Sequence, residues 1–154
     1  MAHGRTDQRG RRGVRPDGDR RRRCPPTSRL KFFLDRSLGK TSARRLRAAG
    51  HVVHLIAEFY LRDAQEIGDA EWITEGCRQG WTLLTKDRRI RCRTDELGAL
   101  TSGHLFCLTD GNATLDQIAQ RFLDAMPAIH RAVQRTEIGF WHVHAGGRIT
   151  RMWP

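Results

Sequence analysis

The sequence lacks a long hydrophobic run and lacks paired cysteines. No apolar stretch approaches the roughly 18 residues of a transmembrane helix, and the N-terminus has no hydrophobic segment of the secretory kind. The four cysteines show no C-x-x-C spacing, which argues against a zinc knuckle or a redox pair. We therefore expect a cytoplasmic protein whose thiols are reduced and which has no membrane association.

Acidic and large apolar residues are scarce in residues 1–29. This segment holds ten arginines and three acids, so it carries +7 of the chain's net charge of +11 and leaves +4 for residues 30–154. Such a composition cannot bury enough surface to offset the entropy of ordering, and we predict a disordered Arg-rich tail. The run Arg20–Arg23 could attract RNA phosphates without sequence preference, and an extension of no function is an equally good interpretation. Residues 30–154 are sufficient for one compact domain.

Within residues 30–154, short apolar runs alternate with amphipathic segments. We predict strands at 30–35, 51–56, 81–85 and 105–109, and helices at 38–49, 69–79, 95–100 and from 114 onward. Thr114 and Gln117 fit a capping box for the last helix, which Pro127 should kink or split. The alternation predicts an α/β fold with a doubly wound, mainly parallel sheet that has helices on both faces.

The C-terminal residues give a different signal. Phe140–Ala145 and Arg148–Trp153 are strand-like and flank Gly146 and Gly147. Because paired glycines permit the primed turns of tight hairpins, we predict a C-terminal β-hairpin.

Acidic residues follow three of the predicted strands. Asp35, Asp87 and Asp110 each stand where a strand ends, and a parallel sheet places ligands outside the carboxyl ends of its strands. Clustered carboxylates repel one another unless a cation neutralises them. Mg²⁺ and Mn²⁺ prefer oxygen ligands, so this edge is a candidate metal site.

Three segments together carry a family resemblance: FLDRSL at 33–38, DAEWI at 69–73 and GWTLLTKD at 80–87. In combination and order they resemble the compact PIN-like domains related to VapC-type toxins, over about residues 30–135. The resemblance implies a three-layer PIN-like fold and a Mg²⁺- or Mn²⁺-dependent endoribonuclease. It further implies the toxin of a toxin–antitoxin pair, with RNA as substrate, a cognate antitoxin as partner and a homodimer as one arrangement.

Site residues follow from the same resemblance. It implies Asp35, Asp69 and Asp87 as metal ligands and catalytic residues, with the Thr85 hydroxyl orienting the site. Larger PIN domains carry a further acid on an intervening helix, and residues 57–68 are too few to supply that helix. The candidates for a fourth ligand are Glu58, Glu71, Glu96 and Asp110, of which Glu71 and Glu96 lie beside the matched segments.

A basic run lies around Asp87 and consists of Lys86, Arg88, Arg89, Arg91 and Arg93. We expect it to hold RNA phosphates beside the metal, although each arginine taken singly fits an ordinary solvated loop. The expected RNA-binding residues are Arg36, Lys86, Arg88, Arg89 and Arg91.

Other interpretations of the same residues stay open. A catalytically silent PIN-like module that binds RNA or a protein would use the same basic loop. A receiver or phosphatase-like domain would use Asp35 as nucleophile, but Ser37 stands where such phosphatases have a second acid. Asp69 could simply cap its helix.

Two further signals are set aside. The segment ending in Lys40 and Thr41 resembles the end of a P-loop, but Leu34 occupies the position of the first required glycine. His142 and His144 project to one side of a strand, without a third metal ligand nearby in the sequence.

Overall fold

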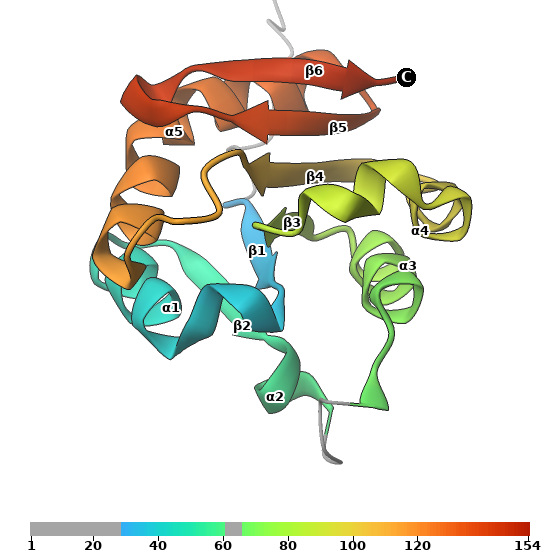
Figure 1. The fold of residues 1–154 in the computed structure, drawn as a ribbon, viewed down its shortest axis with the longest axis horizontal. Coiled ribbons are helices and arrows are strands. Elements are labelled where there is room, and N and C mark those ends of the chain that lie inside the picture. Colours follow the sequence, from blue (N-terminus) through green and yellow to red (C-terminus); the bar gives the residue numbers. More distant parts are fainter. Residues whose placement is uncertain (1–28, 61–65) are drawn as a thin grey trace, which may run out of the picture.

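Residues 29–60 and 66–154 are described by the computed structural model of this chain. The predicted tail, apart from Arg29, therefore lies outside the described residues. The described chain forms one six-stranded sheet in the order β2-β1-β3-β4-β5-β6, with helices packed on both faces (Figure 1). No helix among the described residues is both long enough and apolar enough to span a bilayer.

Five strands are parallel, as the alternation of strands and helices predicted. They are β1 (Lys31–Leu34), β2 (Val52–Leu55), β3 (Thr82–Thr85), β4 (Gly103–Leu108) and β5 (Ile138–Val143). The final strand, β6 (Ile149–Trp153), is antiparallel to β5 and completes the predicted C-terminal hairpin. The predicted strand positions are confirmed to within a few residues at each end.

Two layers of helices cover the sheet (Figure 1). One face is covered by α1 (Gly39–Ala48) and α5 (Leu115–Arg135), and its core includes Phe32, Leu34 and Phe122. The opposite face is covered by α3 (Asp69–Gln79) and α4 (Thr94–Ala99), with Phe33 and Trp72 in its core. Adjacent residues of β1 thus enter opposite cores, as the period of two in a strand requires. A short helix, α2 (Ile56–Phe59), follows β2.

Helix α5 shows both a confirmed and a corrected expectation. Thr114 and Gln117 form the predicted capping box. Pro127 does not split the helix, which continues as one element of 21 residues. Proline removes one backbone hydrogen bond, but Phe122 and Ala125 before it and Ile129 after it are fully buried, so packing on the sheet stabilises both halves.

The loop of the C-terminal hairpin is longer than a two-residue primed turn. It contains the 3₁₀ segment η4 (Ala145–Gly147) and is closed by the backbone N–H of His144, which donates to the carbonyl of Arg148 at 2.8 Å. Gly146 and Gly147 both have positive φ, of 80° and 81°. A Cβ at residue 147 would lie 2.5 Å from the backbone oxygen of Asp124 in α5, so this glycine allows the loop to approach the helix closely.

We expect Gly147→Ala to lower the free energy of unfolding by roughly 3 kcal/mol, because it adds a backbone clash to an unfavourable φ. Gly146→Ala is the matched control: its φ is the same within a degree, but no atom lies within 4 Å of an added Cβ. That change should cost only about 1 kcal/mol. Urea unfolding of both variants measures the difference, and equal losses would contradict the close approach.

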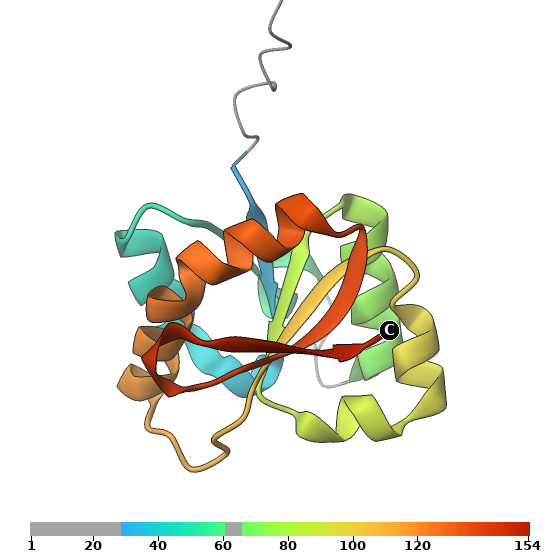
Figure 2. The ribbon, with the colours of Figure 1, turned by 90° about the horizontal axis from the view of Figure 1, so that it is seen from above.

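The carboxyl ends of the parallel strands meet at one edge of the sheet. Figure 2 shows the segments that follow β1, β3 and β4 emerging together at this edge. These segments are η1 (Arg36–Leu38), η3 (Arg88–Cys92) and the loop from Thr109 to Thr114. The first residue of α3 reaches the same edge, since Asp69 lines a cleft there with residues of η1 and η3.

Candidate active site

An open cleft of about 410 Å³ lies at this edge. It collects residues from the ends of β1 and β3, from the start of α3 and from the loop after β4. Its lining residues are Asp35, Arg36, Ser37, Asp69, Lys86, Asp87, Arg89, Arg93 and Gly111. Three acids from three separate parts of the chain therefore share one cleft with four basic side chains.

Asp35 lies at the base of the site and is 5% exposed. Its Oδ2 accepts a hydrogen bond from the Ser37 hydroxyl at 2.6 Å and one from the Thr85 hydroxyl at 2.9 Å. Thr85 ends β3, the neighbour of β1 in the sheet, and is fully buried. The parallel pairing of these strands thus places the hydroxyl against the carboxylate.

Asp87 is joined to the same network through its backbone. Its N–H donates to the Thr85 hydroxyl oxygen at 3.0 Å, so Thr85 contacts both acidic residues. The Asp87 carboxylate accepts the backbone N–H of Arg89 at 2.9 Å and thereby caps η3. The Arg89 guanidinium lies 3.2 Å from the same oxygen.

Asp69 is the first residue of α3, and Gly68 is the N-cap. The Asp69 carboxylate accepts a hydrogen bond from the Trp72 indole N–H at 3.3 Å and one from Arg93 at 3.3 Å. The Asp69 side chain therefore does not cap the helix, and the interpretation of this acid as a helix cap is wrong. The carboxylate instead faces the cleft and an arginine from the segment before α4.

Glu96 lies behind Asp69 and is 8% exposed. Arg93 Nη1 donates to Glu96 Oε1 at 2.6 Å, so one guanidinium nitrogen contacts two carboxylates. The second oxygen, Oε2, is buried and has no hydrogen-bond partner among residues 29–60 and 66–154. A buried carboxylate oxygen without a partner is energetically costly.

The other candidates for a fourth ligand do not line the cleft. Glu71 is exposed and lines a separate hollow on α3. Glu58 pairs with Arg47 at 2.6 Å, and Asp110 pairs with Arg121 of α5 at 2.8 Å. The structure brings Asp35, Asp69 and Asp87 together, with Glu96 connected to them through Arg93.

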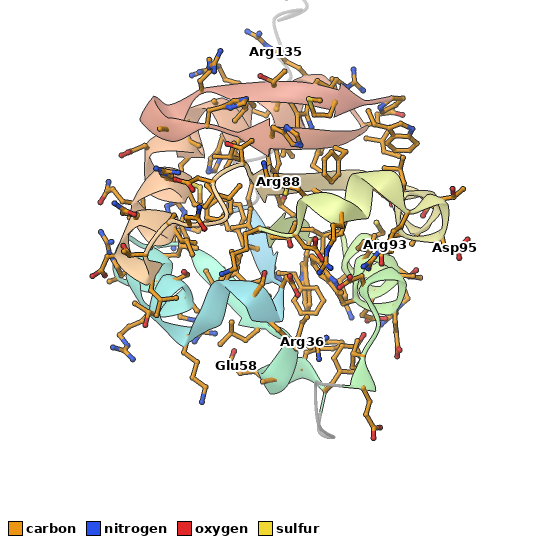
Figure 3. All side chains as sticks on the ribbon, viewed as in Figure 1. Arg36, Glu58, Arg88, Arg93, Asp95 and Arg135 are labelled. Atoms are coloured by element: carbon orange, nitrogen blue, oxygen red, sulfur yellow. The ribbon has the colours of Figure 1, made fainter. Side chains whose placement is uncertain are left out.

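Three of the expected RNA-binding residues line the cleft, namely Arg36, Lys86 and Arg89. Arg88 is exposed nearby, and the side chain of Arg91 lies outside the described part of the molecule. Figure 3 places Arg88 centrally, near the segments that follow the strands, and Arg93 between α3 and α4. The basic side chains therefore lie around the acids at the cleft.

The donor chemistry fits a divalent cation. Three carboxylates line one cleft, and the negative charge of Asp69 disfavours ionisation of Asp35. A bound cation would relieve this repulsion between the carboxylates. Among the described residues, however, no three or more His, Cys, Asp or Glu side chains are arranged so that they could hold a metal ion together. Two of the acids, Asp69 and Asp87, are instead paired with Arg93 and Arg89.

The two strand-end acids have opposite pKa shifts. Burial raises the pKa of Asp35, and the charge of Asp69 adds to this, against the hydrogen bonds from Ser37 and Thr85. Burial also disfavours ionisation of Asp87, but the hydrogen bonds and charge of Arg89 outweigh it and lower the pKa of Asp87. The fold therefore destabilises the charged form of one acid and stabilises that of the other.

These shifts predict opposite pH effects in metal-free protein. Because the pKa of Asp35 is raised, the folded state binds more protons than the unfolded state does. The free-energy cost of ionising Asp35 in the folded protein therefore grows as the pH rises from the ordinary pKa of 3.8 through the raised pKa. Asp35→Asn should thus be more stable than wild type at pH 7, with the gain shrinking toward about pH 4. Asp87→Asn should be less stable at pH 7, with the loss shrinking as pH falls below 3.8 through the lowered pKa.

Urea unfolding in EDTA across this pH range measures both differences. A loss of stability at pH 7 in Asp35→Asn would contradict the raised pKa of Asp35.

Sequence reasoning missed two contributors to the site. In the sequence, Ser37 was noted only because it stands where a phosphatase would have a second acid. Its position two residues after Asp35 is one from which a hydroxyl can form a local hydrogen bond with the carboxylate. Arg93 was considered only as part of a basic run. Its contact with Asp69 joins residues 24 apart in the chain, and no local pattern carries that information.

His142 and His144 lie outside this cleft. Their rings are arranged edge to face with 6.3 Å between the ring centroids, and His144 Nε2 lies 3.0 Å from the Thr150 hydroxyl oxygen across the hairpin.

Comparisons with known proteins give two matches. Residues 30–110 match the family model described as a PIN like domain. The chain is 33% identical over 107 residues to a Mycobacterium tuberculosis protein named "Putative ribonuclease VapC45", an alignment that covers 67% of this chain and 78% of the relative. No solved structure matches significantly.

Proposed function

Because this chain belongs to the PIN-like domain family, we propose that it is a divalent-metal-dependent endoribonuclease and the toxin of a toxin–antitoxin pair. One observation carries the proposal: Asp35, Asp69 and Asp87, which are far apart in the sequence, line a single cleft at the carboxyl edge of the sheet. The name of the Mycobacterium tuberculosis relative supports the nuclease part of the proposal.

In this proposal Asp35, Asp69 and Asp87 hold Mg²⁺ or Mn²⁺ through their carboxylate oxygens. A bound divalent cation supplies polarisation of the phosphoryl oxygen and a lowered pKa for an attacking water. Thr85 positions the acids, because its hydroxyl donates to Asp35 and accepts from the backbone of Asp87. The Ser37 hydroxyl donates to the same Asp35 oxygen and restricts this carboxylate further.

The basic side chains at the cleft would bind the substrate. Arg36, Lys86 and Arg89 line it together with the acids, so a phosphodiester could contact cations and the metal site at once. These contacts are to the backbone of RNA, which carries no sequence information. We propose that they orient the strand, with the exposed Arg88 extending the same surface.

The direct test is cleavage of single-stranded RNA by the purified full chain with Mn²⁺, with Mg²⁺ and with EDTA. The proposal expects cleavage with either metal and none with EDTA. Cleavage that persists in EDTA, or that fails with both metals, would refute a metal-dependent nuclease.

The toxin part has its own test, because an active cytoplasmic ribonuclease would slow the growth of its host. Expression of the chain alone should inhibit growth, and co-expression with the neighbouring open reading frame should restore it. Normal growth without a partner would contradict the toxin role and leave the nuclease proposal standing.

A second function is favoured by one observation. Arg89 and Arg93 already pair with Asp87 and Asp69, as they would in a module that binds RNA or a protein without cutting. Such a module would bind RNA in EDTA as well as in Mn²⁺ and would leave it intact.

A further inference from the structure

Arg93 is the feature of the cleft that the proposed chemistry does not use. It lies between α3 and α4 (Figure 3), and its Nη1 donates to Asp69 Oδ2 at 3.3 Å and to Glu96 Oε1 at 2.6 Å. A guanidinium shared between two carboxylates balances one of their two negative charges in metal-free protein. Any cation that binds Asp69 has to compete with this contact.

The two contacts of Arg93 are unequal. The Glu96 contact is shorter, and the Glu96 side chain is 11% exposed against 19% for Asp69. A shorter, less hydrated contact is the stronger of the two. Arg93 therefore keeps Glu96 more readily than it keeps Asp69.

Glu96 also has the capacity to take a second contact. Its Oε2 is buried and lacks a hydrogen-bond partner within the described residues. A guanidinium and a carboxylate pair best through two parallel hydrogen bonds. The Oε2 atom of Glu96 could accept the second of these bonds from Arg93.

From these contacts we infer that Arg93 and the divalent cation exclude each other at Asp69, and that Glu96 is the acceptor that keeps Arg93 when the cation binds. Arg93 is thus a positioning residue that sets the metal affinity of the cleft. Glu96 acts through Arg93 and is not itself a ligand. This inference rests on the proposed metal site and deepens it.

The test is calorimetric titration of the purified full chain with Mn²⁺ alone, without RNA. Arg93→Gln removes the competitor, so Mn²⁺ should bind roughly threefold to tenfold more tightly. Lys86→Gln is the matched control: it also removes one positive charge from the cleft, but Lys86 makes no ion pair with Asp69 or Glu96 in the described part of the chain. It should tighten binding by less than about twofold.

A double-mutant cycle separates the two roles of Glu96. In wild type, Glu96→Gln weakens the alternative partner of Arg93 and should weaken Mn²⁺ binding by about threefold. In the Arg93→Gln background the same change should have no effect, because no guanidinium remains to be held. A direct ligand would weaken binding in both backgrounds, which would overturn the inference.

Thermal melts of each variant confirm that it is folded. If Arg93→Gln does not fold, Arg93→Lys replaces it: the lysine keeps the charge but loses the fork, and should give a smaller gain in Mn²⁺ affinity than expected for Arg93→Gln, yet above that of Lys86→Gln. An Arg93 variant that binds Mn²⁺ no more tightly than Lys86→Gln would overturn this inference alone. A failure of every form, wild type included, to bind Mn²⁺ would overturn the proposed metal site together with it.

Discussion

Replacing Asp35 with Asn is expected to reduce Mn²⁺-dependent RNA cleavage at least about a hundredfold while the protein stays folded. Asn keeps the shape and one acceptor oxygen for the Ser37 or Thr85 hydroxyl but removes the negative charge that would hold the cation. Asp87→Asn should have the same effect on cleavage. Initial rates on one single-stranded RNA, taken alongside thermal melts, measure activity and folding separately.

Asp95→Asn is the matched control for this pair. Asp95 is an exposed acid in the first turn of α4, and Figure 3 shows it directed away from the molecule at the outer end of that helix. The substitution removes the same charge from a place outside the cleft and should leave cleavage unchanged. Wild-type rates in Asp35→Asn and Asp87→Asn would refute the proposed mechanism.

The second large effect is expected at Asp69. Asp69→Asn should reduce cleavage by at least about tenfold, because the carboxylate that faces Arg93 and the cleft loses its charge. The cost in unfolding free energy should stay at about 1 kcal/mol or less. Asn keeps an acceptor oxygen for the Trp72 indole, and the substitution loses a favourable charge at the helix N-terminus and a partly exposed ion pair with Arg93. Cleavage rates and urea unfolding test the two parts independently.

Glu71→Gln provides the control within the same helical turn. Glu71 is also an acid in the first turn of α3, but it is exposed and lines a different hollow. The helix-end contribution to stability is therefore matched, and only the position relative to the cleft differs. A loss of cleavage in Glu71→Gln equal to that in Asp69→Asn would show that Glu71 has a role at the metal site after all.

The order of elements was readable from the sequence because local patterns determine it. The apolar run of residues 32–34, the end of the helix at residue 79 and the capping box at Thr114 each depend on a few neighbouring residues, and all three are found as predicted. The rules of parallel sheets then place the residues after each strand at one edge. Asp35 and Asp87 could be assigned to that edge from the sequence because each directly follows a strand.

Longer-range packing decided what the sequence left open. Whether Pro127 divides α5 depends on how much buried surface stabilises the helix on either side, and that is a property of the sheet beneath it. The choice among the four candidate acids Glu58, Glu71, Glu96 and Asp110 was likewise undecided. Glu71 and Glu96 both lie beside matched segments, but position in the sequence does not determine which side chain reaches the cleft. The structure shows that Glu58 and Asp110 pair with arginines elsewhere and that Glu71 lines a separate hollow.

The sequence by itself determined the α/β architecture, the acids at the strand ends and the basic run beside one of them, because each of these features depends on residues that are close together in the chain. Only the tertiary structure decided which charges meet. Arg93 reaches Asp69 across 24 residues, and Thr85 reaches Asp35 across 50. Such contacts arise from how α3 and α4 pack on the sheet and how β1 pairs with β3. Charge pairing at the cleft is therefore a consequence of packing, and a local pattern cannot encode it.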